Sequence, residues 1–343
     1  MKEPIKEELR EIREKVQLGQ RLSVSEALWL YRNASLHELG RLANVVRERK
    51  NGNRASYVIN RYLNYSNVCI LSCQFCAFAR RKRDPDAFEY AVEEMVEAAR
   101  QSVAEGITEI HMVGGLHPTL PFSYYTDLLK GLKSVDSGLT LKAFTAIEIR
   151  HLAERVRKAG LRETLEELRE AGLNALTGGG AEIFDPEVRD RICRGKESAE
   201  EWLEVHRTWH QMGERSTCTM LYGHVETVEQ RFDHLSRLRE LQDETGGFTA
   251  LVPYAFEPEN NELSHIRRVG ALEELRMLAL CRLFLDNFDH ITAYWISMGL
   301  SVAQIALSYG VDDLHGTIAE EKSFTWRGRK RRGHDAGQLE RGN

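Results

Sequence analysis

Apolar residues follow two periodicities along this chain. In the first fifty residues they recur at helical spacing, and Leu36, Leu39, Ala43 and Val46 share one face of a helix that begins at Ser35. From about residue 57, short apolar runs alternate with amphipathic stretches, which is typical of strands followed by helices. The runs predict strands at residues 62–68, 108–113, 139–145, 173–176, 216–221, 248–254, 290–296 and 306–309.

Capping residues indicate where several helices begin and end. Asp185 followed by Pro186 is typical of a helix N-terminus. A serine or threonine with glutamate three residues later predicts capping boxes at residues 35–38, 164–167 and 198–201. Residues 225–244 predict a long helix, which ends at the glycine pair Gly246 and Gly247.

The eight apolar runs favour an α/β fold of the (β/α)8 barrel type. They recur about every 32 residues, which is the length of one strand–helix unit in such a barrel. A doubly wound open sheet is the alternative, but no run is followed by its Gly-x-Gly-x-x-Gly fingerprint. We expect a helical extension at residues 1–52, a barrel at 53–320 and a basic, flexible tail at 321–343. The loops that follow the strands are expected to carry the chemistry.

Composition and charge narrow the class of protein. The 343 residues are 42% hydrophobic and 29% charged, with a net charge of -5. These values exclude a disordered chain and a generally basic nucleic-acid binder. Near the C-terminus the chain turns basic, with arginine and lysine at residues 327–332, where a solvated end is the preferred interpretation over nucleic-acid binding.

Two segments bear on the location of the protein. Residues 1–8 are charged and lack the apolar core of a signal peptide. Residues 291–311 contain no Asp, Glu, Lys or Arg, but polar residues interrupt them and no Lys or Arg flanks them. A buried strand followed by a buried helix is therefore preferred to a membrane span. The sequence predicts a cytoplasmic protein that contacts neither membrane nor nucleic acid.

Three of the six cysteines, Cys69, Cys73 and Cys76, lie together directly after the first predicted strand. A structural zinc site takes four protein ligands, but no histidine lies nearby in the sequence and the other three cysteines form no second pair. A site of three cysteines with one open position suits a [4Fe-4S] cluster whose fourth iron binds a small molecule. Zinc with a distant fourth ligand, or three unrelated core cysteines, are the alternatives.

The run Cys69-Ile-Leu-Ser-Cys73-Gln-Phe-Cys76 resembles the cysteine motif of the radical S-adenosylmethionine superfamily. The resemblance implies that the cluster chelates the amino and carboxylate groups of S-adenosyl-L-methionine. It also implies that an electron from the cluster cleaves this molecule to methionine and a 5'-deoxyadenosyl radical. The protein then contributes orientation and exclusion of water.

The same resemblance assigns roles to four residues near the cofactor. Phe75, between the last two cysteines, would lie near the adenine. The main chain of Gly114 and Gly115 would contact the methionyl amine, although Leu116 stands where the family has glutamate. Glu182, which follows a glycine triplet after the fourth predicted strand, would hold the ribose hydroxyls.

Six further segments resemble the aminodeoxyfutalosine synthase family of the futalosine route to menaquinone. They are residues 113–122, 143–149, 178–186, 219–226, 241–248 and 255–260. The resemblance implies that the adenosyl radical adds to the vinyl group of 3-[(1-carboxyvinyl)oxy]benzoate, and that aryl migration and loss of a carboxylate give 6-amino-6-deoxyfutalosine. The alternative is the hydrogen-abstracting dehypoxanthine futalosine cyclase of the same pathway. An electron donor such as flavodoxin or ferredoxin is implied as a partner.

A substrate of this kind requires an apolar slot for its ring and donors or cations for two carboxylates. The candidate catalytic residues are His117, Tyr222 and His224, and the candidate substrate contacts are His117, Glu148, Tyr254 and Asn260. A packed structural histidine is the alternative at positions 117 and 224, and a partner for an arginine is the alternative at position 148. After Lys322 the sequence no longer resembles that of the family. If the corresponding segment of family members closes the mouth of the barrel, this difference would lower activity.

Overall fold

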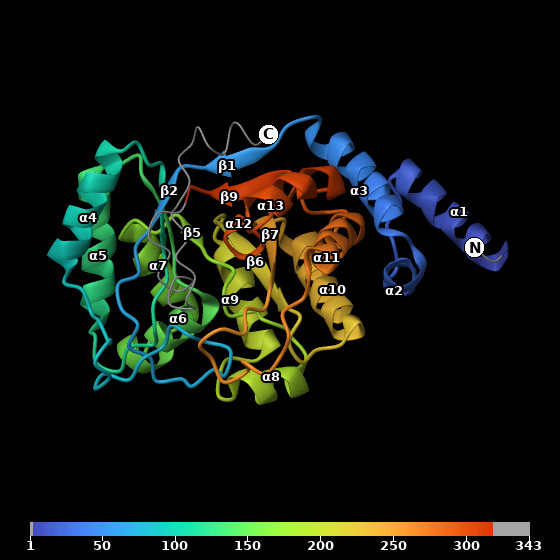
Figure 1. Ribbon diagram of the computed structural model, residues 1–343. Helices are drawn as coiled ribbons and strands as arrows, with labels where there is room; N and C mark the ends of the chain where they lie inside the picture. Colours follow the sequence, from blue (N-terminus) through green and yellow to red (C-terminus); the bar gives the residue numbers. More distant parts are fainter. Residues whose placement is uncertain (1–2, 318–343) are drawn as a thin grey trace.

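The computed structural model describes residues 3–317, in which three helices precede a parallel barrel (Figure 1). The strands are β1 (Ser56–Val58), β2 (Asn60–Tyr62), β3 (Glu109–Met112), β4 (Thr140–Ala143), β5 (Ala175–Leu176), β6 (Arg215–Tyr222), β7 (Phe248–Ala255), β8 (His290–Ile291) and β9 (Asp313–Gly316). The first helices are α1 (Glu3–Leu18), α2 (Val24–Asn33) and α3 (Leu36–Asn51). The later ones are α4 (Val92–Ala104), α5 (Phe122–Val135), α6 (Ala146–His151), the π-helical turn η1 (Leu152–Arg157), α7 (Leu161–Glu170), α8 (Pro186–Cys193), α9 (Ala199–Gln211), α10 (Val228–Thr245), α11 (Ala271–Phe284), α12 (Trp295–Met298), α13 (Leu300–Ala306) and the 3-10 turn η2 (Leu307–Tyr309).

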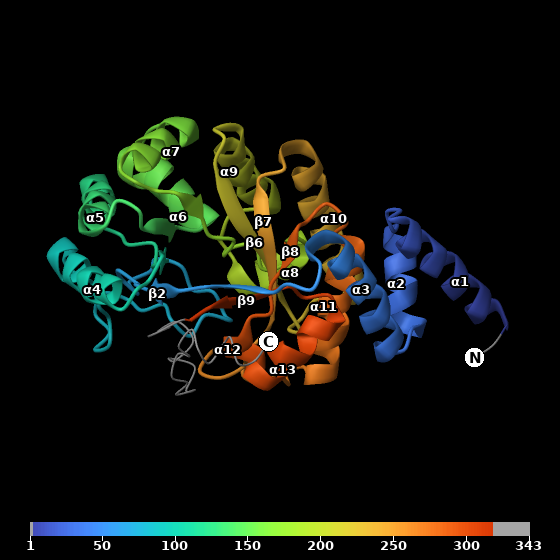
Figure 2. The ribbon, with the colours of Figure 1, turned by 90° about the horizontal axis from the view of Figure 1, so that it is seen from above.

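Strands β2 to β8 form one parallel sheet in sequence order, and Figure 2 shows the helices outside it. Each strand pairs with the next one along the chain, as expected when helical crossovers connect parallel neighbours. The longest register joins β6 to β7, from Ser216 opposite Phe248 to Tyr222 opposite Ala255. Alternate residues of these strands face the barrel interior, and the others face the helices.

Strand β9 closes the ring of strands. It pairs in parallel with β1, with Ser56 opposite Asp313. On its other side a bridge joins Asp313 to Thr292, directly after β8, and the Ala293 N–H donates to the Asp313 carbonyl at 2.8 Å. Because only Ile59 separates β1 from β2, these bonds complete eight strand positions. The predicted (β/α)8 architecture is confirmed.

Two predicted strands are misplaced. Residue 306 ends α13, and residues 307–309 form η2. Tyr309 packs closely against α3, where a Cβ on Gly40 would lie 2.7 Å from its ring. A short apolar run does not distinguish a strand from a short helical turn, which explains the error. The first predicted strand, 62–68, is observed at β1 and β2 instead. Residues 63–68 are buried but irregular, and they bridge to later loop residues at Ser66 and Val68.

The capping predictions are confirmed in part, and at residues 35–38 Ser35 accepts from the Glu38 N–H without the reciprocal bond of a full capping box. Asp185 accepts from the Glu187 and Val188 N–H groups, and a full capping box joins Ser198 to Glu201. Helix α10 ends at Gly246, which has φ of 61°. The capping box predicted at residues 164–167 is wrong, because α7 already begins at Leu161. None of the described helices is long and apolar enough to cross a membrane, and residues 291–311 are divided among β8, α12, α13 and η2.

The N-terminal helices are fastened to the barrel by arginines that bind main-chain carbonyls. Helix α3 packs against α11, and α2 packs against α10 and α11. The Arg239 guanidinium of α10 donates to the Leu22 carbonyl at 2.8 Å, and Arg276 of α11 donates to the Tyr31 and Ala34 carbonyls. The apolar faces of α2 and α3 are buried, so the extension continues the barrel core rather than forming a separate unit.

A buried ion pair holds the closing strand. Arg282 of α11 has no exposed side-chain surface, and it pairs with Asp312, immediately before β9, whose side chain is 1% exposed. Its guanidinium also donates to the Gly310 carbonyl at 2.7 Å and to the carbonyls of Phe288 and Asp289. The pair therefore connects α11 with the segments that precede β8 and β9.

We expect Arg282→Met to lower the free energy of unfolding by about 3–5 kcal/mol, because it leaves the buried Asp312 carboxylate without its cation. Urea-induced unfolding measures this change. Arg10→Met is the matched control, since Arg10 is 63% exposed on α1 and its ion pair should contribute little. A loss below about 1 kcal/mol for Arg282→Met would contradict the role of the pair in closure.

Candidate functional site

The three clustered cysteines lie in the loop that follows β2. Cys69, Cys73 and Cys76 are free and half-buried. The Leu71 N–H donates to Cys69 Sγ and the Ala79 N–H donates to Cys76 Sγ, both at 3.4 Å. Within residues 3–317, no three His, Cys, Asp or Glu side chains gather closely enough to hold a single metal ion.

Main-chain hydrogen bonds fix this cysteine loop. The Cys69 N–H donates to the Arg80 carbonyl at 2.9 Å, and the Arg80 N–H donates to the Asn67 carbonyl at 2.8 Å. The Gln74 N–H donates to the Ile192 carbonyl of α8 at 2.8 Å, which ties the loop to the segment after β5. The loop is thus held at both ends and in the middle by the protein itself.

Burial raises the pKa of the Cys69 thiol, and it raises the pKa of the Cys73 thiol to about 12, against the opposing effect of the Lys196 ammonium. Metal ligation requires thiolates, so binding of a metal centre here must displace protons. The positive charge of the metal and of Lys196 would stabilise the thiolates that result.

The glycine pair after β3 lies against the cysteine loop. The Gly115 N–H donates to the Ser66 carbonyl at 3.0 Å. A Cβ on Gly115 would lie 2.3 Å from the Val68 carbonyl oxygen, and one on Gly114 would lie 2.3 Å from the ring of Tyr65. Only glycine permits this approach of two backbones.

Glu148 fixes the glycine pair from the other side. Its carboxylate is 2% exposed and accepts from the Gly114 N–H at 3.0 Å, the Tyr65 hydroxyl at 2.7 Å, and the N–H and hydroxyl of Thr145 at 2.8 and 2.7 Å. These four bonds occupy the carboxylate with protein donors, and none of them comes from an arginine. In this structure Glu148 is a positioning residue for Gly114.

Glu182 and Phe75 meet at Lys196. The Lys196 ammonium forms a buried ion pair with Glu182 and lies 5.5 Å from the centre of the Phe75 ring. Burial acts to raise the pKa of Glu182, but Lys196 more than offsets it and the pKa is lowered. Arg189 holds the surrounding loop by donating to the Ala181 carbonyl at 2.7 Å and to the Glu197 carbonyl at 2.9 Å.

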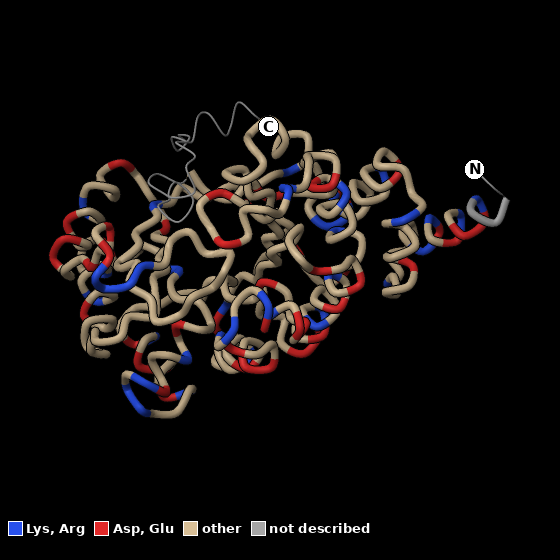
Figure 3. Tube along the Cα trace, turned by 60° about the horizontal axis from the view of Figure 1, so that its bottom comes forward, with Lys and Arg blue, Asp and Glu red and all other residues tan. Residues whose placement is uncertain are grey.

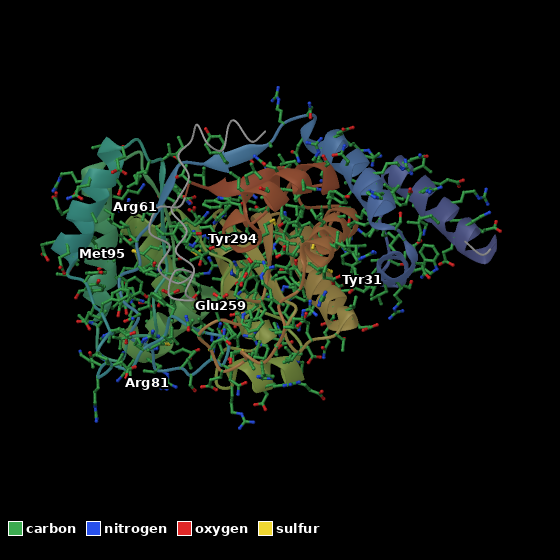
Figure 4. All side chains as sticks on the ribbon, viewed as in Figure 1. Tyr31, Arg61, Arg81, Met95, Glu259 and Tyr294 are labelled. Atoms are coloured by element: carbon green, nitrogen blue, oxygen red, sulfur yellow. The ribbon has the colours of Figure 1, made fainter. Side chains whose placement is uncertain are left out.

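The barrel interior contains a cavity of about 190 Å³. Its lining comes from β2, β3, β6, β7 and β9 and from the segments that follow β3, β4, β5 and β8, and Figure 4 labels Tyr294 near the middle of the barrel. The lining residues are Tyr62, His111, Val113, Thr145, Thr177, Gly178, Gly179, Thr217, Thr219, Val252, Tyr254, Tyr294 and His315. Of the predicted substrate contacts, Tyr254 is among them, whereas Asn260 is exposed in the loop after β7 with φ of 56°.

The two predicted histidines lie outside the cavity lining and are occupied by the protein. His117 Nδ1 accepts from the Thr119 and Leu120 N–H groups, and its Nε2 lies 2.6 Å from the Glu89 carboxylate. His224 accepts from the Val225 N–H at 2.7 Å and donates to the Leu221 carbonyl at 3.0 Å. Both arrangements match the alternative given for these positions, a packed structural histidine.

Tyr222 lies on the outer side of β6. The Arg231 guanidinium of α10 lies 5.1 Å from the centre of its ring, and the side chain is buried between strand and helices. The cavity-facing residues of the same strand are Thr217 and Thr219. Strand alternation explains the difference, because an even-numbered residue of β6 points away from the interior.

Four aromatic or imidazole side chains in the cavity were missed by the sequence analysis: Tyr62, His111, Tyr294 and His315. Tyr62 and His111 lie within or beside predicted strands, so inward alternation could have identified them. His315 lies in β9, a strand that the apolar pattern did not locate. Tyr294 lies in a run that was predicted as a strand and is a strand-to-helix turn.

Comparison with known proteins assigns the family. The model of the radical SAM superfamily matches residues 63–238, which is more than half of the chain, and the model of the CofH/MqnC C-terminal region matches residues 245–338. The chain belongs to the radical SAM superfamily. Among solved structures, methylornithine synthase superposes on this radical SAM protein with a TM-score of 0.75 at 20% identity, covering 96% of this chain and 94% of the other.

Curated relatives of this radical SAM protein include two aminodeoxyfutalosine synthases. The one from Thermus thermophilus is 47% identical and the one from Streptomyces coelicolor is 42% identical. Each alignment covers 91% of this chain, with 84% and 83% of the respective relative. A cyclic dehypoxanthine futalosine synthase from Streptomyces coelicolor is 38% identical over 95% of this chain and 83% of its own length.

The family implies a [4Fe-4S] cluster and S-adenosyl-L-methionine, and the residues present suit both. Three free thiols stand on a loop whose backbone donates to two of the sulfurs. When bound, the pair supplies one-electron cleavage of a sulfonium to an adenosyl radical. In such a site Cys69, Cys73 and Cys76 would be the ligands, and the main chain of Gly114 would stand near them.

We expect Gly115→Ala to reduce iron and labile sulfide in the reconstituted radical SAM protein, because its Cβ would push the Val68 carbonyl and the cysteine loop out of place. Iron and sulfide per chain, measured after anaerobic reconstitution, test this. Gly160→Ala is the matched control, since a Cβ there meets nothing within 4 Å. Full iron content in Gly115→Ala would show that the close approach is unimportant for the cluster.

Proposed function

We propose that this radical SAM protein is an aminodeoxyfutalosine synthase. It adds the 5'-deoxyadenosyl group of S-adenosyl-L-methionine to the vinyl carbon of 3-[(1-carboxyvinyl)oxy]benzoate. Aryl migration and loss of one carboxylate, as bicarbonate or carbon dioxide, then give 6-amino-6-deoxyfutalosine. The observation that carries the proposal is the similarity to two proteins of that name, at 47% and 42% identity over nine-tenths of the chain.

The shape and chemistry of the barrel interior support an aryl substrate. Tyr62, Tyr254 and Tyr294 contribute aromatic walls, and the rings of Tyr254 and Tyr294 lie 5.8 Å apart between centres. Such walls can pack against a benzene ring. Thr145 lines the cavity and also donates to Glu148, so the cavity begins where the Gly114 main chain is fixed. We assign Phe75, Gly114, Gly115 and Glu182 to S-adenosyl-L-methionine.

The protein residues have three tasks in this reaction. Cys69, Cys73 and Cys76 hold the cluster. The hydrogen bond from Gly114 to Glu148 keeps the main chain of the glycine segment in one orientation, so that a methionyl group bound there stays in place. A substrate that fills the cavity would exclude water and hydrogen-atom donors from a reactive radical, which favours addition to the neighbouring substrate over quenching.

Product analysis distinguishes the synthase from the hydrogen-abstracting cyclase. We expect the reconstituted, reduced enzyme to convert S-adenosyl-L-methionine and 3-[(1-carboxyvinyl)oxy]benzoate into 6-amino-6-deoxyfutalosine, detected by mass spectrometry. Cys73→Ala should abolish formation of this product, whereas Cys218→Ala should retain it, because Cys218 is a buried core residue of β6. Free 5'-deoxyadenosine without any adenosyl adduct would contradict the synthase and favour the cyclase.

We further propose that an acidic electron-carrier protein, such as a flavodoxin or ferredoxin, docks over the cysteine loop. Figure 3 shows basic and acidic residues interspersed over most of the chain. Next to the cysteines, however, Arg81, Lys82 and Arg83 are consecutive and exposed, and Figure 4 shows Arg81 at the lower edge of the barrel. Arg81 donates to the Cys69 carbonyl at 2.8 Å, and Ile70 beside it is 38% exposed. A basic rim around an apolar contact suits an acidic partner.

Charge reversal tests this docking. We expect Lys82→Glu/Arg83→Glu to lower the turnover rate about tenfold or more at low salt with reduced flavodoxin, because it replaces attraction with repulsion. The rate with dithionite should be unchanged. Lys6→Glu/Arg10→Glu on α1 reverses the same number of charges far from the cysteines and should leave both rates unchanged. An equal loss with both reductants would place the defect in the site rather than in docking.

A further inference from the structure

One wall of the cavity is a connected group of three side chains, Tyr62, His111 and His315, called here the Tyr-His-His cluster. Tyr62 of β2 stacks on His111 of β3, with ring centres 4.3 Å apart and an angle of 12° between the planes. The Tyr62 hydroxyl lies 2.7 Å from His315 Nε2 of β9. The edge of the His315 ring also faces His111, at 6.3 Å between centres. The cluster thus joins the first, second and last strand positions of the ring.

The backbone of His315 is held in an uncommon conformation that aims its ring inward. Its φ is 64°, in the left-handed region that residues other than glycine rarely adopt. The His315 N–H donates to Asp313 Oδ2 at 3.1 Å, and the same carboxylate accepts from the hydroxyls of Thr292 and Ser56. Such a conformation persists only where its surroundings enforce it, and this is frequent at functional sites.

The cluster has hydrogen-bonding capacity that the described residues do not use. His111 Nδ1 is buried and has no hydrogen-bond partner there. Buried polar atoms are normally paired, and the His111 ring lines the cavity, so a small rotation of this ring would offer its unpaired nitrogen to a ligand there. Burial lowers the pKa of His111 well below its ordinary value and that of His315 to about 3, so both imidazoles are neutral at physiological pH.

The charge around the cavity favours an anion. None of the residues that line it is Asp, Glu, Lys or Arg. Beneath the cluster, Lys142 of β4 forms a buried ion pair with Glu109 of β3 at 3.0 Å. Burial is the main cause of the lowered pKa of both histidines, and the Lys142 ammonium lowers it further, so Lys142 is the nearest cation to this wall. A carboxylate placed against neutral N–H and O–H donors at this wall would be stabilised by the charge of this ammonium.

Size agrees with an aromatic acid. An apolar cavity of roughly 150 Å³ holds a benzene molecule, and this one measures about 190 Å³. Tyr254 and Tyr294 provide the apolar surface for the ring, while the Tyr-His-His cluster provides donors at one side. The geometry points to the Tyr-His-His cluster as the binding site for the ring carboxylate of an aryl acid. The identity of the substrate in this inference rests on the proposed function. Its chemical class, an aryl carboxylate, does not.

The test compares an acid with its amide on the same protein. The probes are 3-[(1-carboxyvinyl)oxy]benzoate and the analogue whose ring carboxylate is a carboxamide, and the measurement is the dissociation constant of each from the reconstituted enzyme. We expect the wild type to bind the acid about tenfold or more tightly than the amide, since charge-assisted hydrogen bonds are stronger than neutral ones. His111→Phe, which keeps the ring stacked on Tyr62, and Tyr62→Phe should each lose most of that preference. His234→Phe, a buried histidine outside the cavity lining, should retain it.

Because the result is a ratio within one protein, a general loss of folded protein does not change it. Retention of the full preference in both His111→Phe and Tyr62→Phe would overturn the inference. If the wild type binds neither probe, the proposed function is contradicted instead, and the ratio for benzoate against benzamide then decides the role of the cluster. A preference for benzoate that disappears in His111→Phe supports an aryl-carboxylate site, and no preference in the wild type overturns it.

Discussion

The whole site depends on the closure of the barrel at Asp313. This one residue pairs with β1 through its main chain, bridges to the end of β8, and accepts three hydrogen bonds at its carboxylate, from Ser56, Thr292 and the His315 N–H. Without that junction the interior would open to solvent between the first and last strands. The buried pair of Arg282 and Asp312 stabilises the same point from outside the ring. The wall of the cavity that includes His315 therefore forms only when the ring closes.

The parts of the site are linked by main-chain hydrogen bonds together with two buried carboxylates, Glu148 and Glu182. The cysteine loop, the Gly114–Gly115 segment and α6 form a chain of contacts in which Glu148 is the common acceptor. A second chain runs from the cysteine loop through Gln74 to α8 and the Lys196–Glu182 pair. Backbone contacts of this kind tolerate substitution of neighbouring side chains but not displacement of the backbone, which explains why glycines stand at the closest approaches.

The architecture was predictable because apolar runs recur at the spacing of a strand–helix unit. The cysteine loop was predictable because three closely spaced cysteines after a first strand are typical of a metal-cluster site. The last strand was not predictable in the same way. Asp313 and His315 are polar because they serve the junction and the cavity, so β9 lacks the apolar pattern of a buried strand. The last strand was instead predicted at the neighbouring apolar run, residues 306–309.

The candidate site residues, like the strands, were located only in part from the sequence. Tyr254 faces the cavity as an inward residue of β7, but His117, Tyr222 and His224 pack against the protein. Residue type alone does not distinguish a histidine that caps a loop from one that borders a cavity, because both need buried hydrogen-bond partners. The distinction lies in strand register and in long-range packing. His111 and His315 are 204 positions apart in the numbering of the chain, yet their rings lie edge to face.

Closure by the last strand also sets an order of events during synthesis. The cysteine loop leaves the ribosome long before Asp313 does, so the nascent chain carries its three thiols in an unfinished barrel with no protected interior. A pocket that includes the β9 wall is available to iron and sulfide only after β9 has left the ribosome. In an aerobic cell, the interval between these two points is when the thiols are most open to oxidation, and faster docking of β9 shortens it.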